Sequence, residues 1–416
     1  MQTTSPRERN SPPHGTCLIC VVFTLAATDF GAALAAERPD VVLMTVEDGS
    51  FTGRLVQSDQ TEAVIETESG ETRRIPVDEL IAIQFNPPAS STPRAWLLLA
   101  NGDRIDGAFH DMSQEALLME WSTHPDRIVL AAPLETVTAS IVDPPASLRE
   151  LQPLLREISS GRFDADTLIF SDGSRLAGEL SSATPDAFRL KTSVGEVAVD
   201  SARVAALALN SSLVSFPAPG KNSVLIRFVD GSWITFEDLA IDKELLARGR
   251  ASFGERLEFP VSMISRIEFF GPRVVALSEV TAQDVSATPY LSRRHDMAPN
   301  RNVRGGFLRI RGREYARGIG MTSGMSASYS LDEEYSFFQA VVGIDDQTDG
   351  LGSAVFVVEI DGARAYESPA ITGDSAAIET PRIDLTGADE LTLRVEFGEF
   401  GNIQDVANWC RPILVR

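Results

Sequence analysis

The chain has 416 residues, which is room for two to four domains rather than one. Its 59 Asp and Glu residues outnumber its 37 Lys and Arg residues, so the net charge is −22. This acidity disfavours binding to nucleic acid or to anionic lipid, because both present phosphate groups that the chain repels. A hydrophobic fraction of 43% excludes a chain that is disordered throughout.

Residues 1–36 have the pattern of a secretory signal peptide. Arg7 and Arg9 precede an apolar run at 17–27, and small residues follow it up to Ala35. The run is too short to span a bilayer as a permanent helix. We therefore expect cleavage close to Ala35 and an exported protein, whether periplasmic, in the cell envelope or secreted, with no transmembrane span in the mature chain.

The cysteine and histidine content gives little support for redox or metal chemistry. Cys17 and Cys20 lie inside the apolar run and leave with the signal peptide, so the mature chain keeps Cys410 and forms no intramolecular disulfide. The four histidines are scattered and form no pair at metal-ligand spacing. We expect no required cofactor.

Two short patterns recur four times in the first two thirds of the chain. The first is a β-run, an Asp-Gly or Asn-Gly turn and a second β-run, which together predict a hairpin; it occurs at 46–53, 99–107, 170–178 and 228–234. The second ends about 36 to 40 residues after each turn glycine; it occurs at 76–85, 133–142, 200–209 and 260–269. The Asp-Gly pairs are interpreted as type I′ turns, which need positive φ, rather than as ligand-binding residues.

Each repeat is predicted to contain five short strands in about 45 residues, a size typical of a small, bent SH3-like or Sm-like barrel. We place the four β repeats at 37–86, 94–143, 164–210 and 222–271. The apolar strand, Asp-Gly and following glycine resemble the first motif of Sm-like barrels over about a dozen residues per unit. Sm-like proteins bind RNA, which the net charge opposes here. A four-bladed propeller is the alternative.

A linker helix is predicted at 144–160, between the second and third repeats. After Pro144 and Pro145, leucines and an isoleucine between 148 and 158 fall on one helical face. A unit as small as one repeat buries little apolar surface alone, so neighbouring repeats should pack together. We expect the helix to cover the seam between repeats 2 and 3.

The composition changes near residue 272, where the repeats stop. All five tyrosines follow this point, and strands with period-2 alternation are predicted at 337–344, 354–360 and 390–397, with a hairpin turn at Asp361-Gly362. About 140 residues of antiparallel strand without a long helix predict a β-sandwich over 272–416. The predicted fold is therefore all-β: four small barrels followed by a sandwich.

Several motifs in this last third resemble one family of carbohydrate-binding modules. They are RGIG at 317–320, YSFFQAVVGIDD at 335–346, GSAVFVVEIDG at 352–362 and NWCRP at 408–412. Together they look like the NPCBM family over about residues 273–416. The resemblance implies a galactose-binding-like jelly-roll sandwich, of the kind found as an accessory module in secreted glycoside hydrolases, including family 98 enzymes, and in exported proteins without a catalytic domain.

The chain departs from the family pattern at three places. Thr322 is followed by Ser323 where family members commonly carry His, Asn408 replaces Asp before Trp409, and Arg293 stands where an acidic residue is frequent. In related modules these positions lie near the loops that present the sugar. Sugar binding can therefore be altered or lost even if the fold is kept.

The candidate sugar-binding residues are aromatic plates and polar groups near these motifs. Trp409, Tyr290 and Tyr315 could stack on a pyranose ring, and Asn408 and Arg411 could hydrogen-bond its hydroxyls. The alternative for Trp409 is a core position.

Asp345 and Asp346 form a second candidate site. They are interpreted as a turn cap or a solvated loop, with a structural Ca²⁺ site as the alternative.

The function that these observations favour is an exported, non-catalytic, multi-module protein that binds carbohydrate, of galactose type or related, through its C-terminal module, with the repeats as a scaffold. Residues 37–271 show no α/β alternation, no Gly-x-Ser-x-Gly elbow and no His-Glu-x-x-His. Two alternatives stay open: an envelope scaffold whose sandwich binds other proteins, and an accessory part of a glycoside hydrolase system.

Overall fold

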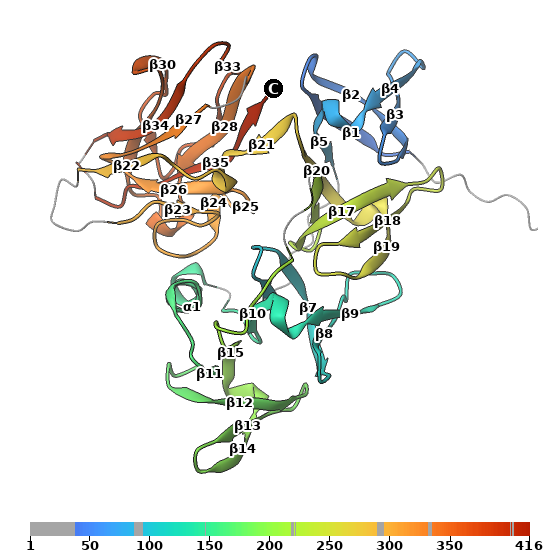
Figure 1. The fold of residues 1–416 in the computed structure, drawn as a ribbon, viewed down its shortest axis with the longest axis vertical. Coiled ribbons are helices and arrows are strands. Elements are labelled where there is room, and N and C mark those ends of the chain that lie inside the picture. Colours follow the sequence, from blue (N-terminus) through green and yellow to red (C-terminus); the bar gives the residue numbers. More distant parts are fainter. Residues whose placement is uncertain are drawn as a thin grey trace, which may run out of the picture. The chain divides into compact units, whose positions relative to one another are not determined.

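The computed structural model describes residues 38–86, 95–145, 147–217, 220, 222–288, 295–331, 335–399, 401 and 403–416. The predicted signal peptide lies outside these residues. Residues 38–416 form one compact unit. Strands dominate it, and Figure 1 shows the helix α1 (Leu148–Ser160) as the α-helix of the described chain. No helix within the described ranges is both long and apolar enough to cross a membrane.

The first two thirds of the chain contain four units of five strands, here called repeats 1 to 4, each with a short 3-10 helix before its last strand. Repeat 1 comprises β1 (Asp40–Thr45), β2 (Gly49–Ser58), β3 (Glu62–Glu66), β4 (Thr72–Pro76), η1 (Val77–Glu79) and β5 (Leu80–Phe85). Repeat 2 comprises β6 (Ala95–Leu99), β7 (Arg104–Met112), β8 (Ala116–Glu120), β9 (Val129–Pro133), η2 (Leu134–Thr136) and β10 (Val137–Ile141). Repeat 3 comprises β11 (Asp166–Phe170), β12 (Arg175–Ala183), β13 (Ala187–Thr192), β14 (Gly195–Asp200), η3 (Ser201–Arg203) and β15 (Val204–Ala208). Repeat 4 comprises β16 (Ser223–Phe228), β17 (Trp233–Ile241), β18 (Leu246–Ala251), β19 (Arg256–Pro260), η4 (Val261–Met263) and β20 (Ile264–Phe270).

Within each repeat the first strand pairs antiparallel with both the second and the fifth, and the second, third and fourth form a meander. The second strand carries a register shift in all four units, between Leu55 and Gln57 in repeat 1. Such a bulge bends the strand, so the four-times repeated pattern in the sequence corresponds to a four-times repeated bent sheet.

A glycine next to each bulge permits close approach of the second and third strands. A Cβ atom at Gly107 would lie 2.4 Å from the carbonyl oxygen of Glu120, and Gly53 and Gly178 are equally confined. In repeat 4 the glycine has moved to the facing strand, where a Cβ atom at Gly249 would lie 2.8 Å from the ring of Phe236. The second and third strands can therefore approach this closely only where one of the two facing residues is a glycine.

The Asp-Gly and Asn-Gly hairpins are confirmed as turns with positive φ at glycine, but they are not of type I′. Gly49, Gly102, Gly173 and Gly231 have φ between 76° and 102°, whereas the residue before each of them does not have positive φ. In repeat 2 the Gly102 N–H donates to the Leu99 carbonyl at 3.0 Å. In such a turn the glycine at the end has the left-handed conformation, so positive φ is needed at one residue. A type I′ turn would need it at two residues.

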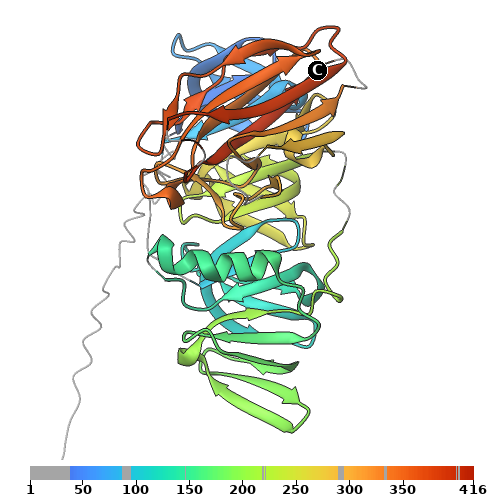
Figure 2. The same cartoon turned by 90° about the vertical axis from the view of Figure 1, so that its left-hand side faces the viewer.

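The repeats pair with one another through their fifth strands, but not in chain order. β5 of repeat 1 pairs with β20 of repeat 4, and β10 of repeat 2 pairs with β15 of repeat 3. β17 of repeat 4 also touches β7 of repeat 2, so the order of contacts is 1, 4, 2, 3 (Figures 1 and 2). No strand pairing joins repeats 1 and 3 in the described chain, and the four units therefore do not close into a ring of propeller blades.

Helix α1 lies where the sequence predicted it and covers the predicted seam. Its buried leucines Leu151, Leu154 and Leu155 share one apolar cluster with residues of β6 and β10 in repeat 2 and of β11 and β15 in repeat 3. Figure 2 shows the helix lying across the strands of these two repeats. The apolar face of the helix is thus buried against strands of two neighbouring repeats.

The last third of the chain is a sandwich of two antiparallel sheets. The first sheet has the order β23 (Ala298–Pro299), β26 (Gly318–Thr322), β35 (Val406–Val415), β28 (Phe337–Ile344), β32 (Ile378–Glu379), with β21 (Val274–Ala276) on β35 and β33 (Ile383–Asp384) on β28. The second has the order β22 (Asp284–Ala287), β27 (Met325–Ser330), β34 (Glu390–Phe397), β29 (Ser353–Ile360), β30 (Ala363–Glu367), with β31 (Ile371–Thr372) on β29. The short helices η5 (Leu277–Glu279) and η6 (Asp346–Thr348) and a separate hairpin, β24 (Leu308–Ile310) with β25 (Arg313–Tyr315), complete the domain. The three strands predicted from alternation are confirmed as β28, β29 and β34.

Arg104 of β7 is buried where repeats 2 and 4 meet the sandwich. Its side chain is 3% exposed. The guanidinium carbon lies 4.6 Å from the centre of the Trp96 ring, 4.2 Å from that of Trp233 and 5.1 Å from that of Phe307. These rings come from repeat 2, repeat 4 and the sandwich, so one cation is surrounded by aromatic faces from three parts of the chain.

Two carboxylates share the charge of Arg104. Its Nε donates to Asp106 at 2.7 Å, and its Nη1 donates to Glu314 of β25 at 2.9 Å. Burial lowers the pKa of Arg104, but these carboxylates outweigh burial and raise the pKa above its ordinary value. Burial is the main cause that raises the pKa of Asp106 to about 7; Arg104 opposes the rise, and the neighbouring carboxylates Asp230 and Glu314 contribute to it.

Repeats 2 and 4 also exchange reciprocal hydrogen bonds at their turns. Trp233 Nε1 donates to the Gly102 carbonyl at 2.7 Å, and Arg104 Nη2, from the corresponding position of the other repeat, donates to the Gly231 carbonyl at 2.8 Å. Asp230, the acidic residue of the repeat 4 turn, accepts from Trp121 Nε1 of repeat 2 at 2.8 Å. The turn residues therefore form hydrogen bonds between repeats 2 and 4 in addition to closing their own hairpins.

A second reciprocal pair of hydrogen bonds joins equivalent positions of the same two chain segments. The Asp103 carboxylate accepts the Thr235 N–H at 2.8 Å, and Ser232 Oγ accepts the Asp106 N–H at 2.9 Å. Burial raises the pKa of Asp103, and the hydrogen bonds from Thr235 and Asn101 oppose that rise. The pairing of equivalent positions makes this contact a local pseudo-two-fold interface.

Replacing Arg104 by methionine is expected to lower the free energy of unfolding by about 3–5 kcal/mol, because Asp106 and Glu314 are left buried without their cation. The measurement is urea denaturation of residues 37–416. Arg54→Met is the matched control, since Arg54 is exposed and its 3.1 Å pair with Asp40 is also exposed; it should cost less than about 1 kcal/mol. Equal losses in the two variants would contradict the role given to Arg104.

The titration of Asp106 should make the folded chain less stable as the pH rises. Its pKa of about 7 when folded exceeds the ordinary 3.8, so the folded state holds the proton more tightly between these values. The contribution is therefore fully present below about pH 4 and is lost as the pH approaches 7. Asp106→Asn should remove this part of the pH dependence, measured as the difference in unfolding free energy between wild type and variant at pH 4.5, 6 and 7.5. Parallel curves for the two proteins would show the expectation to be wrong.

Candidate functional site

Trp409, the first candidate for sugar stacking, lies in the core of the sandwich. Its relative exposure is 0%, and its ring centre is 5.2 Å from that of Phe356 and 6.3 Å from that of Phe338. A ring without exposed surface offers no face to a pyranose. The stacking interpretation of Trp409 is thus corrected in favour of the core position that the sequence had left open.

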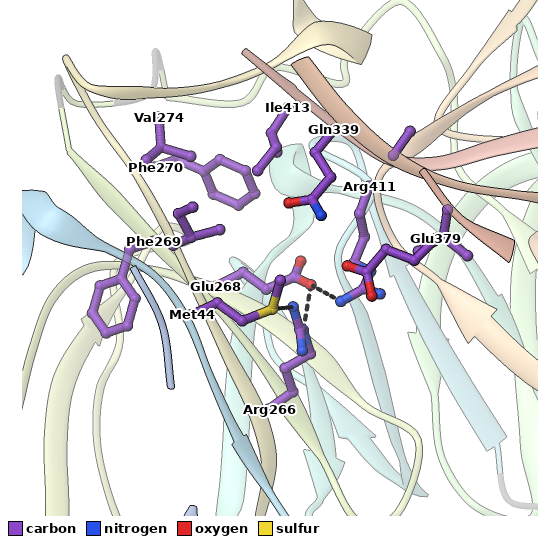
Figure 3. A pocket seen from close by; sticks show the side chains of 13 residues that line it. Met44, Arg266, Glu268, Phe269, Phe270, Val274, Gln339, Glu379, Arg411 and Ile413 are labelled. Atoms are coloured by element: carbon purple, nitrogen blue, oxygen red, sulfur yellow. Dashed lines mark hydrogen bonds and ion pairs between the residues drawn. The ribbon is translucent and has the colours of Figure 1, made fainter. Parts of the chain in front are cut away.

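Tyr315 and Arg411 lie together at the junction between the sandwich and repeat 4. Tyr315 is 5% exposed, and the guanidinium carbon of Arg411 lies 5.7 Å from its ring centre. Arg411 Nη1 is 3.8 Å from Glu268 of β20, which also binds Arg266 at 2.6 Å. Figure 3 shows both guanidinium groups directed at Glu268.

The cavity that Arg411 lines in Figure 3 has a volume of about 30 Å³. This is room for about one water molecule and not for a sugar ring. Burial raises the pKa of Glu268, but the charges of Arg266 and Arg411 outweigh it and hold the pKa below the ordinary value. Tyr315 and Arg411 therefore hold the sandwich against repeat 4, and their predicted role in an open sugar site is corrected.

Asn408 and Asp345 form a buried pair inside the sandwich. Asn408 Nδ2 donates to Asp345 Oδ2 at 2.6 Å, and the same carboxyl accepts the Arg309 N–H at 3.1 Å and the Gln347 N–H at 3.0 Å. Burial raises the pKa of Asp345 to about 6. Asn408 is fully buried and points away from solvent, so the structure corrects its predicted contact with sugar hydroxyls.

Asp345 and Asp346 act as caps and as ties to the β24–β25 hairpin. Asp345 is the N-cap of η6, and Asp346 accepts the N–H groups of Arg311 at 2.6 Å and Gly312 at 2.7 Å. This is the turn-cap role that the sequence favoured. Among the described residues no group of three or more His, Cys, Asp or Glu side chains is placed to hold a metal ion.

The stacking candidate Tyr290 and Arg293, one of the three departures from the family pattern, lie outside the described residues. Thr322 is the last residue of β26 and pairs with Val406, which places it at the end of the sandwich where β35 begins. Its neighbour Ser323 is buried there and donates from Oγ to Asp405 at 2.6 Å. This end of the sandwich thus contains one of the three positions that depart from the family pattern.

Exposed apolar side chains gather at this same end. Leu351 is 59% exposed, Phe397 39% and Ile403 61%. They come from the loop before β29, the end of β34 and the loop before β35; Phe397 is in register with Ala354 at the start of β29. Ser323, Leu351, Phe397, Ile403 and Asp405 are called the loop platform below.

Buried hydrogen bonds hold the loop platform in place. The Asp405 carboxylate accepts the Ser353 N–H at 2.8 Å, and the Gly398 N–H donates to the Ser353 carbonyl at 3.0 Å. Phe397 packs on the β26–β27 turn, where a Cβ atom at Gly324 would lie 2.8 Å from its ring. Sequence reasoning missed this site; the signal available was an apolar strand that ends in Phe397 and runs into a loop with glycines at 398 and 401.

Among the described aromatic residues of the sandwich, Phe397 alone is exposed. Its relative exposure is 39%, whereas Trp409 and Tyr315 are buried at 0% and 5%.

Comparisons with known proteins find similarities to the last third of the chain. Residues 273–415 match the model of the NPCBM/NEW2 domain. A Renibacterium salmoninarum protein named "Putative endo-alpha-N-acetylgalactosaminidase" is 35% identical over 102 residues, which are 24% of this chain and 7% of that protein. The chain thus matches only a small part of this much longer relative.

The solved structures to which parts of this chain are similar include CBM51 modules. A Clostridium perfringens GH95 module in complex with methyl-galactose is 23% identical, with a TM-score of 0.31 over 34% of this chain and 99% of that chain. CBM51-2 of Clostridium perfringens ZmpB in complex with GlcNAc, solved with INT domains, is 19% identical, with a TM-score of 0.32 over 43% of this chain and 44% of that chain. Tandem CBM51 modules of the Streptococcus pneumoniae family 98 glycoside hydrolase are 13% identical, with a TM-score of 0.31 over 60% of this chain and 87% of that chain.

Substitutions at Trp409 should behave as core substitutions. Trp409→Ala is expected to lower the free energy of unfolding by about 3–5 kcal/mol, because a fully buried ring leaves a cavity. Phe397→Ala, at the loop platform, should cost less than about 1 kcal/mol, since its ring is partly in solvent. Urea denaturation of both variants measures the difference, and a smaller loss at Trp409 than at Phe397 would contradict the assignment.

Proposed function

We propose that the chain is a non-catalytic carbohydrate-binding protein whose NPCBM/NEW2 domain binds glycan. The match of residues 273–415 to the family model is the observation that carries this proposal. The Renibacterium salmoninarum relative is named for an activity on α-linked N-acetylgalactosamine. Galactose-type glycans and their N-acetylated forms are therefore the first ligands to test.

The loop platform is the site that we assign to the glycan. Phe397 supplies an exposed ring for the apolar face of a pyranose, and Leu351 and Ile403 extend the apolar surface beside it. The carboxylate of Asp405 and the hydroxyl of Ser323 lie beneath the loops and fix their shape rather than reach solvent. Rings stacked in this way are typical anchors in ligand sites, with a few polar groups for orientation.

We further propose that the protein is exported and that repeats 1 to 4 act as its scaffold. The signal-peptide pattern at 1–36 supports export. The contacts of Arg104 and Arg411 support a scaffold role, since they fix the sandwich to the repeats through Glu314 and Glu268.

Protein recognition by the sandwich is the second candidate function. It is favoured by the departure at Thr322, at the same end of the sandwich, and by the exposed residues of the loop platform, which are two aliphatic side chains and one aromatic ring. In this alternative the fold of the module is kept while its ligand has changed. A role as the accessory part of a glycoside hydrolase system is compatible with either ligand.

A glycan array probed with residues 37–416, with calcium and again with chelator, tests the proposal. We expect binding to glycans with terminal galactose or N-acetylgalactosamine. Phe397→Ala should weaken binding of the best glycan by at least about tenfold, because an aromatic contact of this kind is worth about 0.5–1.5 kcal/mol beyond its buried area. Val194→Ala, at an exposed hairpin of repeat 3, is the matched control and should bind as the wild type does.

A folded wild type that binds no glycan on the array would refute the proposal and favour protein recognition. Binding that disappears with chelator would reopen the question of a metal site. Hydrolysis of any arrayed glycan by the purified chain would contradict the non-catalytic assignment.

A further inference from the structure

A second small cavity lies between repeat 4 and the β24–β25 hairpin of the sandwich. It shares Arg266, Glu268 and Arg411 with the cavity in Figure 3, and its volume is also about 30 Å³. Its lining lies within the described ranges, and so do the neighbours of each lining residue in the chain. It is called the arginine cavity below. Its charged lining residues are Arg227, Arg266, Arg313, Arg411, Glu268 and Glu314.

The lining of the arginine cavity carries more positive than negative charge. Four guanidinium groups and two carboxylates give a net charge of +2. Glu379, an exposed residue that lines the cavity of Figure 3, reduces the sum to +1 when it is included. Arg104 also binds Glu314, but it brings Asp106 as its own partner, so this pair adds no net negative charge. Positive charge is therefore concentrated at one junction of a chain whose net charge is −22.

Arg411 has the fewest hydrogen-bond partners in this cluster. Its side chain is 15% exposed, and Glu268 lies 3.8 Å from it. Within the described ranges no acceptor receives a hydrogen bond from its side chain, and its Nε is buried without a partner. A guanidinium has five N–H donors, and a buried donor without an acceptor costs free energy. An acceptor that is not a protein group is therefore needed beside Arg411.

The backbone of β35 directs the Arg411 side chain at this junction. Between the pairs Gln339–Ile413 and Val341–Cys410, two residues of β35 oppose one residue of β28. Such a bulge re-aims a side chain. Arg411 itself has a φ of 47°, a left-handed conformation that is costly for a residue with a side chain. Its neighbour Cys410 is fully buried in the sandwich, whereas Arg411 turns toward repeat 4.

The guanidinium groups of the cavity lower one another's pKa. Burial and the charge of Arg411 lower the pKa of Arg266 to about 10. Burial also lowers the pKa of Arg227; Glu314 opposes this effect, and Arg104 and Arg313 add to it. Arginine nevertheless stays protonated at neutral pH, so the loss of a proton does not relieve the repulsion. A counter-ion between the groups would relieve it.

The volume of the cavity limits the size of this counter-ion. About 30 Å³ is room for one species of the size of a water molecule. A halide ion such as chloride is close to that size and accepts hydrogen bonds from N–H groups in several directions. Sulfate, phosphate and carboxylates are larger, and a cation is repelled by the net positive lining. A water molecule would supply an acceptor but no negative charge.

We propose that the arginine cavity binds one small monovalent anion of halide type. Arg227 of repeat 4 and Arg313 and Arg411 of the sandwich would donate to it, so guanidinium groups of both parts share one counter-ion. The anion thereby strengthens the junction beside the ion pairs of Glu268. The site is separate from the loop platform, and the proposal does not depend on glycan binding.

The line width of chloride in NMR spectra of residues 37–416 tests the proposal. Chloride that exchanges between water and a protein site gives a broadened line, and the excess width measures the bound fraction. At constant ionic strength, set with sodium gluconate, we expect excess width that added bromide removes and that added sulfate leaves in place. Non-specific binding of chloride is disfavoured by the net charge of −22.

Arg411→Met should reduce the excess width at least tenfold, because it removes the guanidinium and keeps an apolar side chain in its place. Arg394→Met is the matched control with the same change of net charge. Arg394 is 39% exposed and binds Glu359 at 3.0 Å on the other sheet of the sandwich, so this variant should bind chloride as the wild type does. Arg313→Met is a milder variant, since Arg313 is exposed; it should keep the fold and weaken binding several-fold.

Glu268→Gln should change chloride binding in the opposite direction. It removes a carboxylate that competes for Arg266 and Arg411, and it raises the net charge of the lining to +3. Chloride affinity should therefore rise several-fold. A loss of packing at the junction would not produce this increase.

The outcomes decide the site independently of the glycan array. A folded wild type without excess width, or equal widths for Arg411→Met and Arg394→Met, would refute the anion site and leave the proposed function as it stands. If Arg411→Met does not fold, wild-type binding by Arg313→Met refutes the site in its place. Weaker binding by Glu268→Gln would contradict the role given to the charge. Displacement by sulfate as readily as by bromide would overturn the assignment to a small anion.

Discussion

The burial of one cation, Arg104, sets how the parts of the chain fit together. A guanidinium removed from water needs counter-charges and acceptors matched to its N–H groups, and these are supplied by Asp106, by Glu314 and by the Gly231 carbonyl. Each comes from a different part: repeat 2, the sandwich and repeat 4. The aromatic rings around it exclude water and strengthen these interactions. The ion pairs and hydrogen bonds of this one side chain therefore hold repeat 2, repeat 4 and the sandwich together.

Much of the fold could be predicted from the sequence because it depends on local signals. The Asp-Gly turns, the glycines of the bent strands and the leucine face of α1 each act within a few residues of themselves. The order in which the repeats pair could not be predicted in this way. The paired residues Gln84 of β5 and Arg266 of β20 are 182 positions apart in the sequence. No local pattern marks either strand as the partner of the other.

The candidate site was harder to predict for a related reason. β35 is buried at nine of ten positions, because one of its faces packs in the sandwich core and the other is covered by the β24–β25 hairpin and the repeats. The period-2 pattern that separates a core face from a solvent face is then absent. Trp409 and Asn408 could therefore not be assigned to the core face or the solvent face from the sequence. The contact between Arg411 and repeat 4 could not be predicted either. Phe397 was overlooked because an aromatic residue at the end of an apolar strand fits a core position as well as an exposed one, and the glycines after it indicate a loop but not a ligand.

The order of contacts between repeats also has a consequence for how the chain is made. Repeat 4 lies between repeats 1 and 2, so β5 offers a bare strand edge from the time it leaves the ribosome until β20 has been synthesised. An uncovered edge of sequence LIAIQF is a site for unwanted pairing between nascent chains. Contacts of such long sequence separation also slow folding, since the loop must close before they form. Repeat 1 is thus synthesised before repeats 2 to 4, but the strand that pairs with its β5 is made only at the end of repeat 4.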